Sequence, residues 1–289
     1  MHDSDGYRRK NALGLAMPMQ NSNQTDILER IQSALQAAHT VLRQFTPGAI
    51  QAEYKNGSDP VTEADRQVDA LLQKHLLRDG EGWLSEESVD DLTRLDKTRV
   101  WVVDPLDGTR EFVAGIPEFC VSVALVESHR PIAGGICNPA TGETFIGSLD
   151  TGVMYNGKPA TPSSRISLDG AVALASRSEI KRGEWKEFSN GPFQIRPVGS
   201  VAYKLALVSA GLGDLTFTLC PKNEWDVAAG AALVLSSGGS VETLEGTELR
   251  CNNRSPRISG LIACSHSLRP ALISFLADRL PSPAFNPHG

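Results

Sequence analysis

The sequence has few cysteines, no excess of basic residues and no long hydrophobic run, and each absence excludes a class of protein. The five cysteines are odd in number and widely spaced, without a CxxC pair, which argues against a disulfide framework and a zinc site. Buried, reduced thiols are the better interpretation, and they favour a cytoplasmic location. With 28 Lys and Arg against 34 Asp and Glu, the net charge is −6, so a general nucleic-acid binder is not expected.

The chain also lacks the roughly 20 consecutive apolar residues of a membrane span, so no membrane partner is predicted. Residues 1–24 show no periodicity and are interpreted as a disordered leader. Basic residues at 8–10 precede an apolar stretch, as in a signal peptide, but the stretch is short and Pro18 interrupts it. No internal repeat is present.

Hydrophobic spacing gives an outline of the secondary structure. Helices are predicted over 26–45, 63–77, 200–210, 227–235 and 267–280, and strands over 99–103, 119–127, 132–138, 143–147, 171–175, 193–197, 215–219 and 260–264. Strands alternate with helices only after Pro162. This change predicts an N-terminal α+β half over 25–162 and a C-terminal α/β half over 163–289 that completes the active site.

One segment imitates a phosphate-binding P-loop. Residues 152–158 have the required glycines and lysine, but Pro159 replaces the Ser or Thr that would hold Mg²⁺. Asn156-Gly157 instead predicts the turn of a β-hairpin.

Carboxylates gather where an apolar strand ends. Asp104 and Asp107 follow that strand, and Gly108-Thr109 begins a turn or short helix. Side chains at a strand end are held rigidly, and a glycine at a helix start lets an anion approach backbone N–H groups. The segment therefore offers a cation site beside a phosphate site, with an ordinary Asx turn as the structural alternative.

Two further acidic segments favour the cation site. Glu86-Glu87 follows a short apolar run, and Asp226 heads an apolar helix; a solvated loop and a helix N-cap are the alternatives. Oxygen ligands from separate loops are what Mg²⁺ prefers. Two such ions about 3.5–4 Å apart can clamp the attacking and leaving oxygens of a phosphoryl transfer.

Four segments, in the order in which they follow one another along the chain, resemble the inositol monophosphatase superfamily of Mg²⁺-dependent, lithium-sensitive phosphatases. The resemblance covers about residues 25 to 280. The segments are Asp-Pro-Leu-Asp-Gly-Thr at 104–109, Trp-Asp-x-Ala-Ala-Gly at 225–230, Glu-Glu-Ser at 86–88, and the segment 59–65. The superfamily also contains 3′(2′),5′-bisphosphate nucleotidases. The resemblance implies an α+β fold, a layered αβαβα sandwich, and hydrolysis of a small phosphate monoester by metal-activated water.

The resemblance also implies a ligand set for two Mg²⁺ ions. Glu86, Asp104 and the Leu106 carbonyl would bind the first ion, and Asp104, Asp107 and Asp226 the second. A third, weaker ion would use Glu86 and water.

By the same resemblance, Asp65 and Thr109 would position and activate the nucleophilic water, and Glu86 is the third predicted catalytic residue. The backbone N–H groups of Gly108 and Thr109 would hold the phosphate. The alternative for Asp65 is a capping box with Thr62 at the start of a helix.

The substrate signals conflict. Segments 110–112 and 176–178 and Glu224 resemble bisphosphate nucleotidases, which act on 3′-phosphoadenosine 5′-phosphate, whereas segments 116–122 and 199–211 resemble inositol phosphatases. Candidate substrate contacts are Arg177, Ser200, Lys204 and Lys222. For the three cations, the alternative is a solvated surface position.

Two classes of function follow. The first is an Mg²⁺-dependent phosphomonoesterase for a small phosphorylated substrate, in a family whose members are often homodimers. The second is a catalytically silent, metal-binding regulatory protein. The complete set of acidic residues favours the enzyme, because degenerate members usually lose ligands first.

Overall fold

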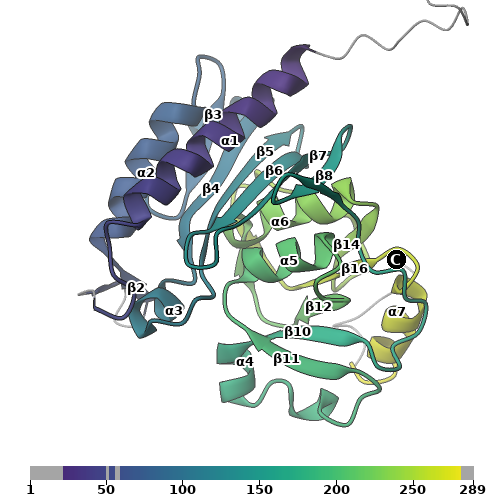
Figure 1. Ribbon diagram of the computed structural model, residues 1–289. Coiled ribbons are helices and arrows are strands. Elements are labelled where there is room, and N and C mark those ends of the chain that lie inside the picture. Colours follow the sequence, from purple (N-terminus) through teal and green to yellow (C-terminus); the bar gives the residue numbers. More distant parts are fainter. Residues whose placement is uncertain (1–21, 50–51, 56–58, 281–289) are drawn as a thin grey trace, which may run out of the picture.

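The structure is a computed structural model that describes residues 22–49, 52–55 and 59–280 (Figure 1). Most of the predicted leader, residues 1–21, lies outside these ranges, and Ser22–Gln24 already belong to the first helix. No helix within the described ranges is long and apolar enough to cross a membrane.

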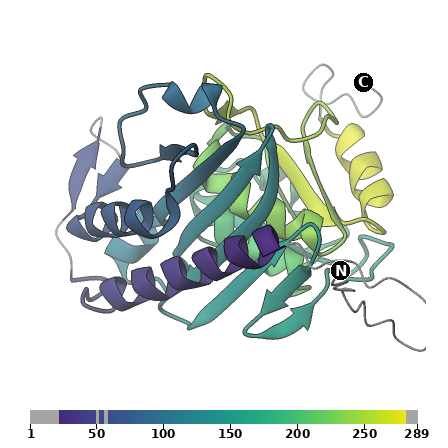
Figure 2. The same cartoon turned by 90° about the horizontal axis from the view of Figure 1, so that it is seen from above.

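Helices and sheets alternate in five layers (Figures 1 and 2). Helices α1 (Ser22–Leu42) and α2 (Glu63–Leu76) cover the outer face of the first sheet. Helices α5 (Val201–Ser209) and α6 (Glu224–Ser236) lie between the two sheets. Helix α7 (Arg269–Ala277) covers the outer face of the second sheet. This arrangement confirms the predicted α+β sandwich.

The first sheet has seven strands in chain order, and β3 and β4 are its only parallel pair. Its strands are β3 (Gly82–Ser85), β4 (Arg99–Asp107), β5 (Cys120–Glu127), β6 (Arg130–Asn138), β7 (Glu143–Ser148), β8 (Gly152–Tyr155) and β9 (Lys158–Ala160). Asn156 and Gly157 join β8 to β9 with positive φ angles, which confirms the hairpin at the P-loop look-alike.

The second sheet has the order β11-β10-β12-β16-β14. Its strands are β10 (Val172–Ser176), β11 (Gln194–Val198), β12 (Leu215–Thr218), β14 (Gly239–Thr243) and β16 (Leu261–Ser265). The shorter elements are β1 (Glu53–Lys55), β2 (Asp59–Val61), β13 (Lys222–Asn223), β15 (Arg257–Ile258), α3 (Thr109–Ala114), α4 (Arg177–Arg182), η1 (Thr93–Asp96) and η2 (Lys186–Phe188).

Strand β4 is buried on both faces, which explains its unbroken apolar sequence. Val100 and Val102 face the middle helices, whereas Trp101 and Val103 face α1 and α2. The strand is therefore fixed from both sides up to the residue before Asp104.

The middle helices have no polar face because both sheets cover them. Gly230 lets α6 approach α5 closely: a Cβ at this position would lie 2.3 Å from the Cβ of Leu205. Helix α6 begins at Glu224, three residues before the predicted start, because Asn223 forms a capping box with Asp226. The division into halves near residue 162 stays a proposal, since α6 of the second half packs against strands of the first sheet.

Replacing Gly230 with alanine should destabilise the protein by about 1–3 kcal/mol, because the added methyl group collides with α5. In an exposed helix the same change would stabilise by about 1 kcal/mol. Urea denaturation of both proteins measures the difference. A gain in stability would contradict the close packing of α5 and α6.

Candidate active site

Glu86 and Asp104 meet because two parallel strands end together. Ser85 of β3 is in register with Val103 of β4, so the next residue of each chain segment lies at the same edge. The Glu86 N–H donates to the Val103 carbonyl at 3.4 Å. Asp104 accepts a 2.9 Å bond from the Leu106 N–H, so the predicted Asx-type turn exists together with the acidic cluster.

Asp226 reaches the same place from the middle layer. Ser122 of β5 pairs with Asp104 across the sheet, and its hydroxyl donates to the Trp225 carbonyl at 3.3 Å. Asp226 is the third residue of α6, and its carboxylate accepts the Asn223 N–H at 2.9 Å. It completes a capping box and is not itself the N-cap.

One carboxylate oxygen each of Glu86, Asp104 and Asp226 lie within 4.8 Å of one another. Burial raises the pKa of Asp104 well above its usual value, and the charges of Glu86, Asp107 and Asp226 raise it further. Burial and then the charge of Asp107 likewise raise the pKa of Asp226. The cluster is therefore a partly buried group of carboxylates, with Asp104 at its buried end.

Asp107 lies beside this cluster and faces helix α5. Its Oδ2 accepts the Ser200 hydroxyl and the Ala202 N–H, each at 2.7 Å. Burial raises the pKa of Asp107, while these two bonds lower it. Ser200 has a φ of +57° and also caps α5 by accepting the Tyr203 N–H. Ser200 thus holds Asp107 at the start of α5, and its contact with substrate stays a prediction.

Asp65 makes both the capping contacts and the Thr109 contact that its two predicted roles require. Its Oδ2 accepts the Thr62 N–H at 2.7 Å and the Thr62 hydroxyl at 2.6 Å, which confirms the capping box. Its Oδ1 lies 3.2 Å from the Thr109 hydroxyl, which also lies 2.9 Å from the Leu106 carbonyl. Burial raises the pKa of Asp65.

Gly108 shapes the backbone beside the cluster. Its φ is +95°, and a Cβ there would lie 3.0 Å from the Glu118 carbonyl, so only glycine fits without strain. Thr109 then begins α3, and the first N–H groups of a helix have no partner within it. The local geometry agrees with a phosphate-binding role, which stays a prediction.

The three candidate cations differ in exposure, and each has a partner within the protein. Lys204 is only 4% exposed and donates to the Ser200 carbonyl at 3.1 Å, and burial lowers its pKa. Lys222 forms an ion pair with the buried Glu179 at 2.8 Å. Arg177 binds both carboxylate oxygens of Glu118. The surface alternative is therefore wrong for Lys204 and Lys222, whereas the Arg177 side chain is 40% exposed. Their contact with substrate stays a prediction.

Two supporting residues had no assigned role in the sequence analysis. Asp69 accepts the hydroxyls of Ser85 and Ser88 on either side of Glu86. The signal available was its place four residues after Asp65, on the same face of a helix. Glu118 links Arg177 to the Gly199 N–H, and no pattern in the sequence indicates this contact.

Glu224 fixes the start of α6. This fully buried carboxylate accepts the N–H groups of Asn252 and Asn253 at 2.6 and 2.9 Å. Asn252 in turn accepts a 2.6 Å bond from the buried Arg94, which follows β3. The network holds the loop 252–253, the segment after β3 and the helix that carries Asp226 in one arrangement.

A second group of possible metal ligands consists of Glu179, Glu184 and Cys220. Its charge is already balanced, because Lys222 pairs with Glu179 and Arg182 pairs with Glu184. The group at Glu86 is different: the charges of Glu86 and Asp226 raise the pKa of Asp104, and the charge of Glu86 raises that of Asp226. Its oxygen-only donor set and its unbalanced charge fit a hard divalent cation such as Mg²⁺.

The fold and the site together define a class: a five-layer α+β protein whose carboxylates converge at the end of a central strand. A sequence model of the inositol monophosphatase family matches residues 23–277, and the chain belongs to this family.

Individual relatives agree with this assignment. An inositol-1-monophosphatase from Mesorhizobium japonicum is 32% identical over 78% of this chain and 88% of its own length. The Nus factor SuhB from Xylella fastidiosa is 30% identical over 84% and 93%. An IMPase structure from Thermotoga maritima superimposes with a TM-score of 0.75 at 28% identity, over 88% of this chain and 97% of its own.

The raised pKa values predict how the stability of the metal-free protein depends on pH. Asp104, Asp107 and Asp226 bind protons more tightly in the folded protein than in the unfolded chain. Their contribution to stability is therefore complete below about pH 4, the pKa of aspartate in the unfolded chain. It is lost as the pH rises through their higher pKa in the folded protein. The melting temperature in EDTA should therefore rise between about pH 8 and 5.5. Saturating Mg²⁺ should reduce this slope by stabilising the ionised ligands, while Asp65 and Glu224, whose pKa values are also raised, keep their contribution.

Thermal unfolding across this range, with EDTA or Mg²⁺, measures both effects. Residues with lowered pKa, such as Glu118 and Glu179, lose their contribution only near or below about pH 4.5 and do not interfere. A melting temperature in EDTA that stays level or falls toward pH 5.5 would contradict the description of the cluster.

Proposed function

We propose that this protein is an Mg²⁺-dependent, lithium-sensitive phosphomonoesterase that hydrolyses a small phosphate monoester. Two of its relatives are named inositol-1-monophosphatase, which is an activity of this class. The observation that carries the proposal is the meeting of Glu86, Asp104 and Asp226 from three separate elements. The Asp65–Thr109 pair lies within the same site, because Thr109 also contacts the Leu106 carbonyl between the two aspartates of β4.

Four carboxylates and one carbonyl would hold two metal ions: Glu86, Asp104, Asp107, Asp226 and Leu106. When bound, such ions lower the pKa of a water molecule and neutralise charge on the leaving oxygen. The chain's own residues supply position. Asp107 is held by Ser200 and Ala202, and Asp226 by Asn223, so their carboxylates need little rearrangement.

Thr109 and Asp65 orient the nucleophilic water. The Thr109 hydroxyl has one hydrogen bond to donate, either to Asp65 or to the Leu106 carbonyl, and its lone pairs remain to accept a hydrogen bond from water. Because burial raises the pKa of Asp65 toward neutrality, this carboxylate is a better proton acceptor than an exposed aspartate. The N–H groups of Gly108 and Thr109 would hold the phosphate.

Asp104→Asn should reduce phosphate release by at least about a hundredfold, because it alters the ligand proposed to bind both ions; loss of an outer-shell partner alone costs about 10–100-fold. The assay is release of phosphate from inositol-1-phosphate with Mg²⁺, with and without lithium. Asp150→Asn, an exposed aspartate in the turn before β8, is the matched control. Near-normal rates for Asp104→Asn would refute the role.

The competing class is a regulatory protein that binds metal without turnover, and one similar relative is named a Nus factor. The complete carboxylate set and the intact Asp65–Thr109 contact favour the enzyme. Wild-type protein that binds Mg²⁺ but releases no phosphate from any monoester offered would favour the regulator.

A nucleoside bisphosphate such as 3′-phosphoadenosine 5′-phosphate is the second candidate substrate. Lys204 and Lys222 both lie close enough to Asp107 to lower its pKa electrostatically, so two ammonium groups adjoin the proposed metal site. A second phosphate bound beside the first would meet these charges. Their present partners are a backbone carbonyl and Glu179.

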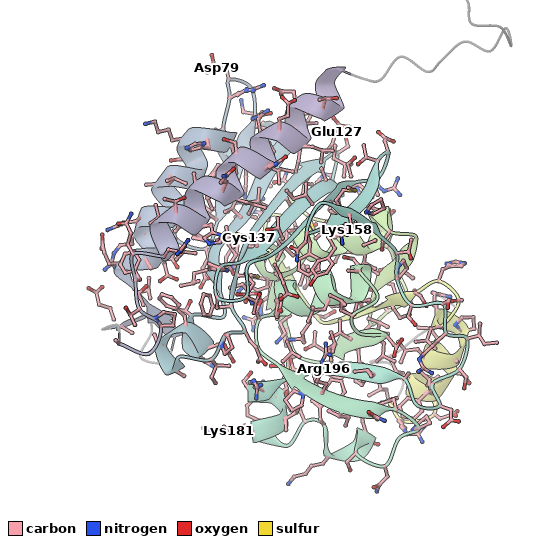
Figure 3. The ribbon with its side chains drawn as sticks, in the orientation of Figure 1. Asp79, Glu127, Cys137, Lys158, Lys181 and Arg196 are labelled. Atoms are coloured by element: carbon pink, nitrogen blue, oxygen red, sulfur yellow. The ribbon has the colours of Figure 1, made fainter. Side chains whose placement is uncertain are left out.

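If the substrate is a bisphosphate, Lys222→Met should raise its KM by about tenfold or more, because a charge-assisted bond to phosphate is lost. The KM for inositol-1-phosphate should change much less. Lys158→Met, an exposed lysine on β9 (Figure 3), is the control. Equal effects on both substrates would mean that Lys222 acts only by neutralising the buried Glu179.

A further inference from the structure

We propose that Asp69 is a positioning residue that holds Glu86 in the metal site and thereby sets the affinity for the divalent cation. This inference rests on the proposed function, because it assigns to Glu86 the role of a metal ligand. Asp69 itself has no part in the ligand set implied by the family resemblance.

Asp69 binds the loop that carries Glu86 on both sides of that residue. Its Oδ1 accepts the Ser85 hydroxyl at 2.5 Å, and its Oδ2 accepts the Ser88 hydroxyl at 2.6 Å. Both distances are at the short end for hydrogen bonds from a hydroxyl to a carboxylate. One side chain on α2 thus anchors both ends of the segment 85–88.

The same two hydroxyls also accept hydrogen bonds from neighbouring residues of β3 and of the loop. The Ser85 hydroxyl accepts the Glu87 N–H at 3.3 Å, and the Ser88 hydroxyl accepts the Trp83 indole N–H at 3.3 Å. The loop is therefore folded around the Asp69 carboxylate. In contrast, the backbone bond from Glu86 to Val103 is 3.4 Å long, beyond the usual range.

Glu86 needs such a restraint because it lies among like charges. Its carboxylate has an oxygen within 4.8 Å of an oxygen of Asp104 and of Asp226, so the three negative charges repel one another when no cation is bound. A loop free to move away would relieve this repulsion and would have to be ordered again on binding. A loop held in place avoids that entropic cost, which favours tighter binding.

Helix α2 also contacts two parts of the proposed site, the water-orienting Thr109 and the loop that carries Glu86. Asp65 and Asp69 lie one turn apart on it, and they bind Thr109 and the Glu86 loop respectively. Val68 and Leu72 of the helix are fully buried, so the helix is a rigid support. The distance between the water-orienting threonine and Glu86 is thus set by one helix.

The test is calorimetric titration of Mg²⁺ into metal-free wild-type, Asp69→Ala and Asp69→Asn proteins. Asp69→Ala should weaken binding about tenfold, within the range for outer-shell partners of metal ligands. Asp69→Asn keeps one acceptor oxygen, so its affinity for Mg²⁺ should lie between those of the wild type and Asp69→Ala. Asp79→Asn removes the same charge beyond the end of α2 (Figure 3) and should bind as the wild type does.

Melting temperatures in EDTA separate this role from a purely structural one. A variant that unfolds at a lower temperature yet binds Mg²⁺ within twofold of wild type would overturn the inference. If Asp69→Ala does not fold, Ser88→Ala replaces it and should weaken binding about threefold; unchanged binding there would equally overturn the inference. The double variant Asp69→Ala/Ser88→Ala should bind Mg²⁺ no more weakly than Asp69→Ala does, since Asp69→Ala already removes the bond between Asp69 and Ser88.

Different results would overturn the proposed function and the role of Asp69. Wild-type protein that binds no Mg²⁺ and releases no phosphate would overturn both proposals. Wild-type protein that binds Mg²⁺ and is active, together with an Asp69→Ala variant of unchanged affinity, would overturn only the role of Asp69.

Discussion

Repulsion among buried carboxylates is the constraint on which the arrangement of the site depends. Asp104, Asp107 and Asp226 all have raised pKa values, with burial as the largest cause. Each nevertheless accepts a hydrogen bond from a different backbone segment: Leu106, Ala202 and Asn223. Fixed N–H dipoles stabilise the ionised forms without balancing their charge. The result is a site whose remaining negative charge can be neutralised by a cation of the right size.

Helix capping and the proposed chemistry share the same residues. Asp65 and Asp226 occupy the third position of α2 and α6, and Asp107 meets the first turn of α5 from outside that helix. A carboxylate at a helix start is favoured by the helix dipole, which offsets part of its desolvation cost. For Asp65 the division is visible by atom, since one oxygen caps α2 and the other contacts Thr109. A structural role and a functional role therefore do not exclude each other here.

Local patterns in the sequence predicted much of the fold and the linear part of the site. The segment 104–109 could be recognised because its ligands are neighbours in the chain, and the layers followed from the resemblance of four such segments. The surface alternative for Lys204 was wrong because its helix lies between two sheets and has no solvent face. The role of Asp69 depends on serines 16 and 19 residues away, at the end of a strand whose parallel pairing with β4 no local pattern specifies.

The two parts of the chain contribute different groups to the site. Residues up to 109 supply Asp65, Glu86, Asp104 and Asp107, whereas the later part supplies Asp226, the start of α5 and the lysines. Asp226 is the only member of the closest cluster that comes from the later part. A cation bound between Asp104 and Asp226 would therefore link the first sheet directly to the middle helices. The buried network of Arg94, Asn252 and Glu224 makes a similar connection without a cation, because it joins the segment after β3 to the start of α6.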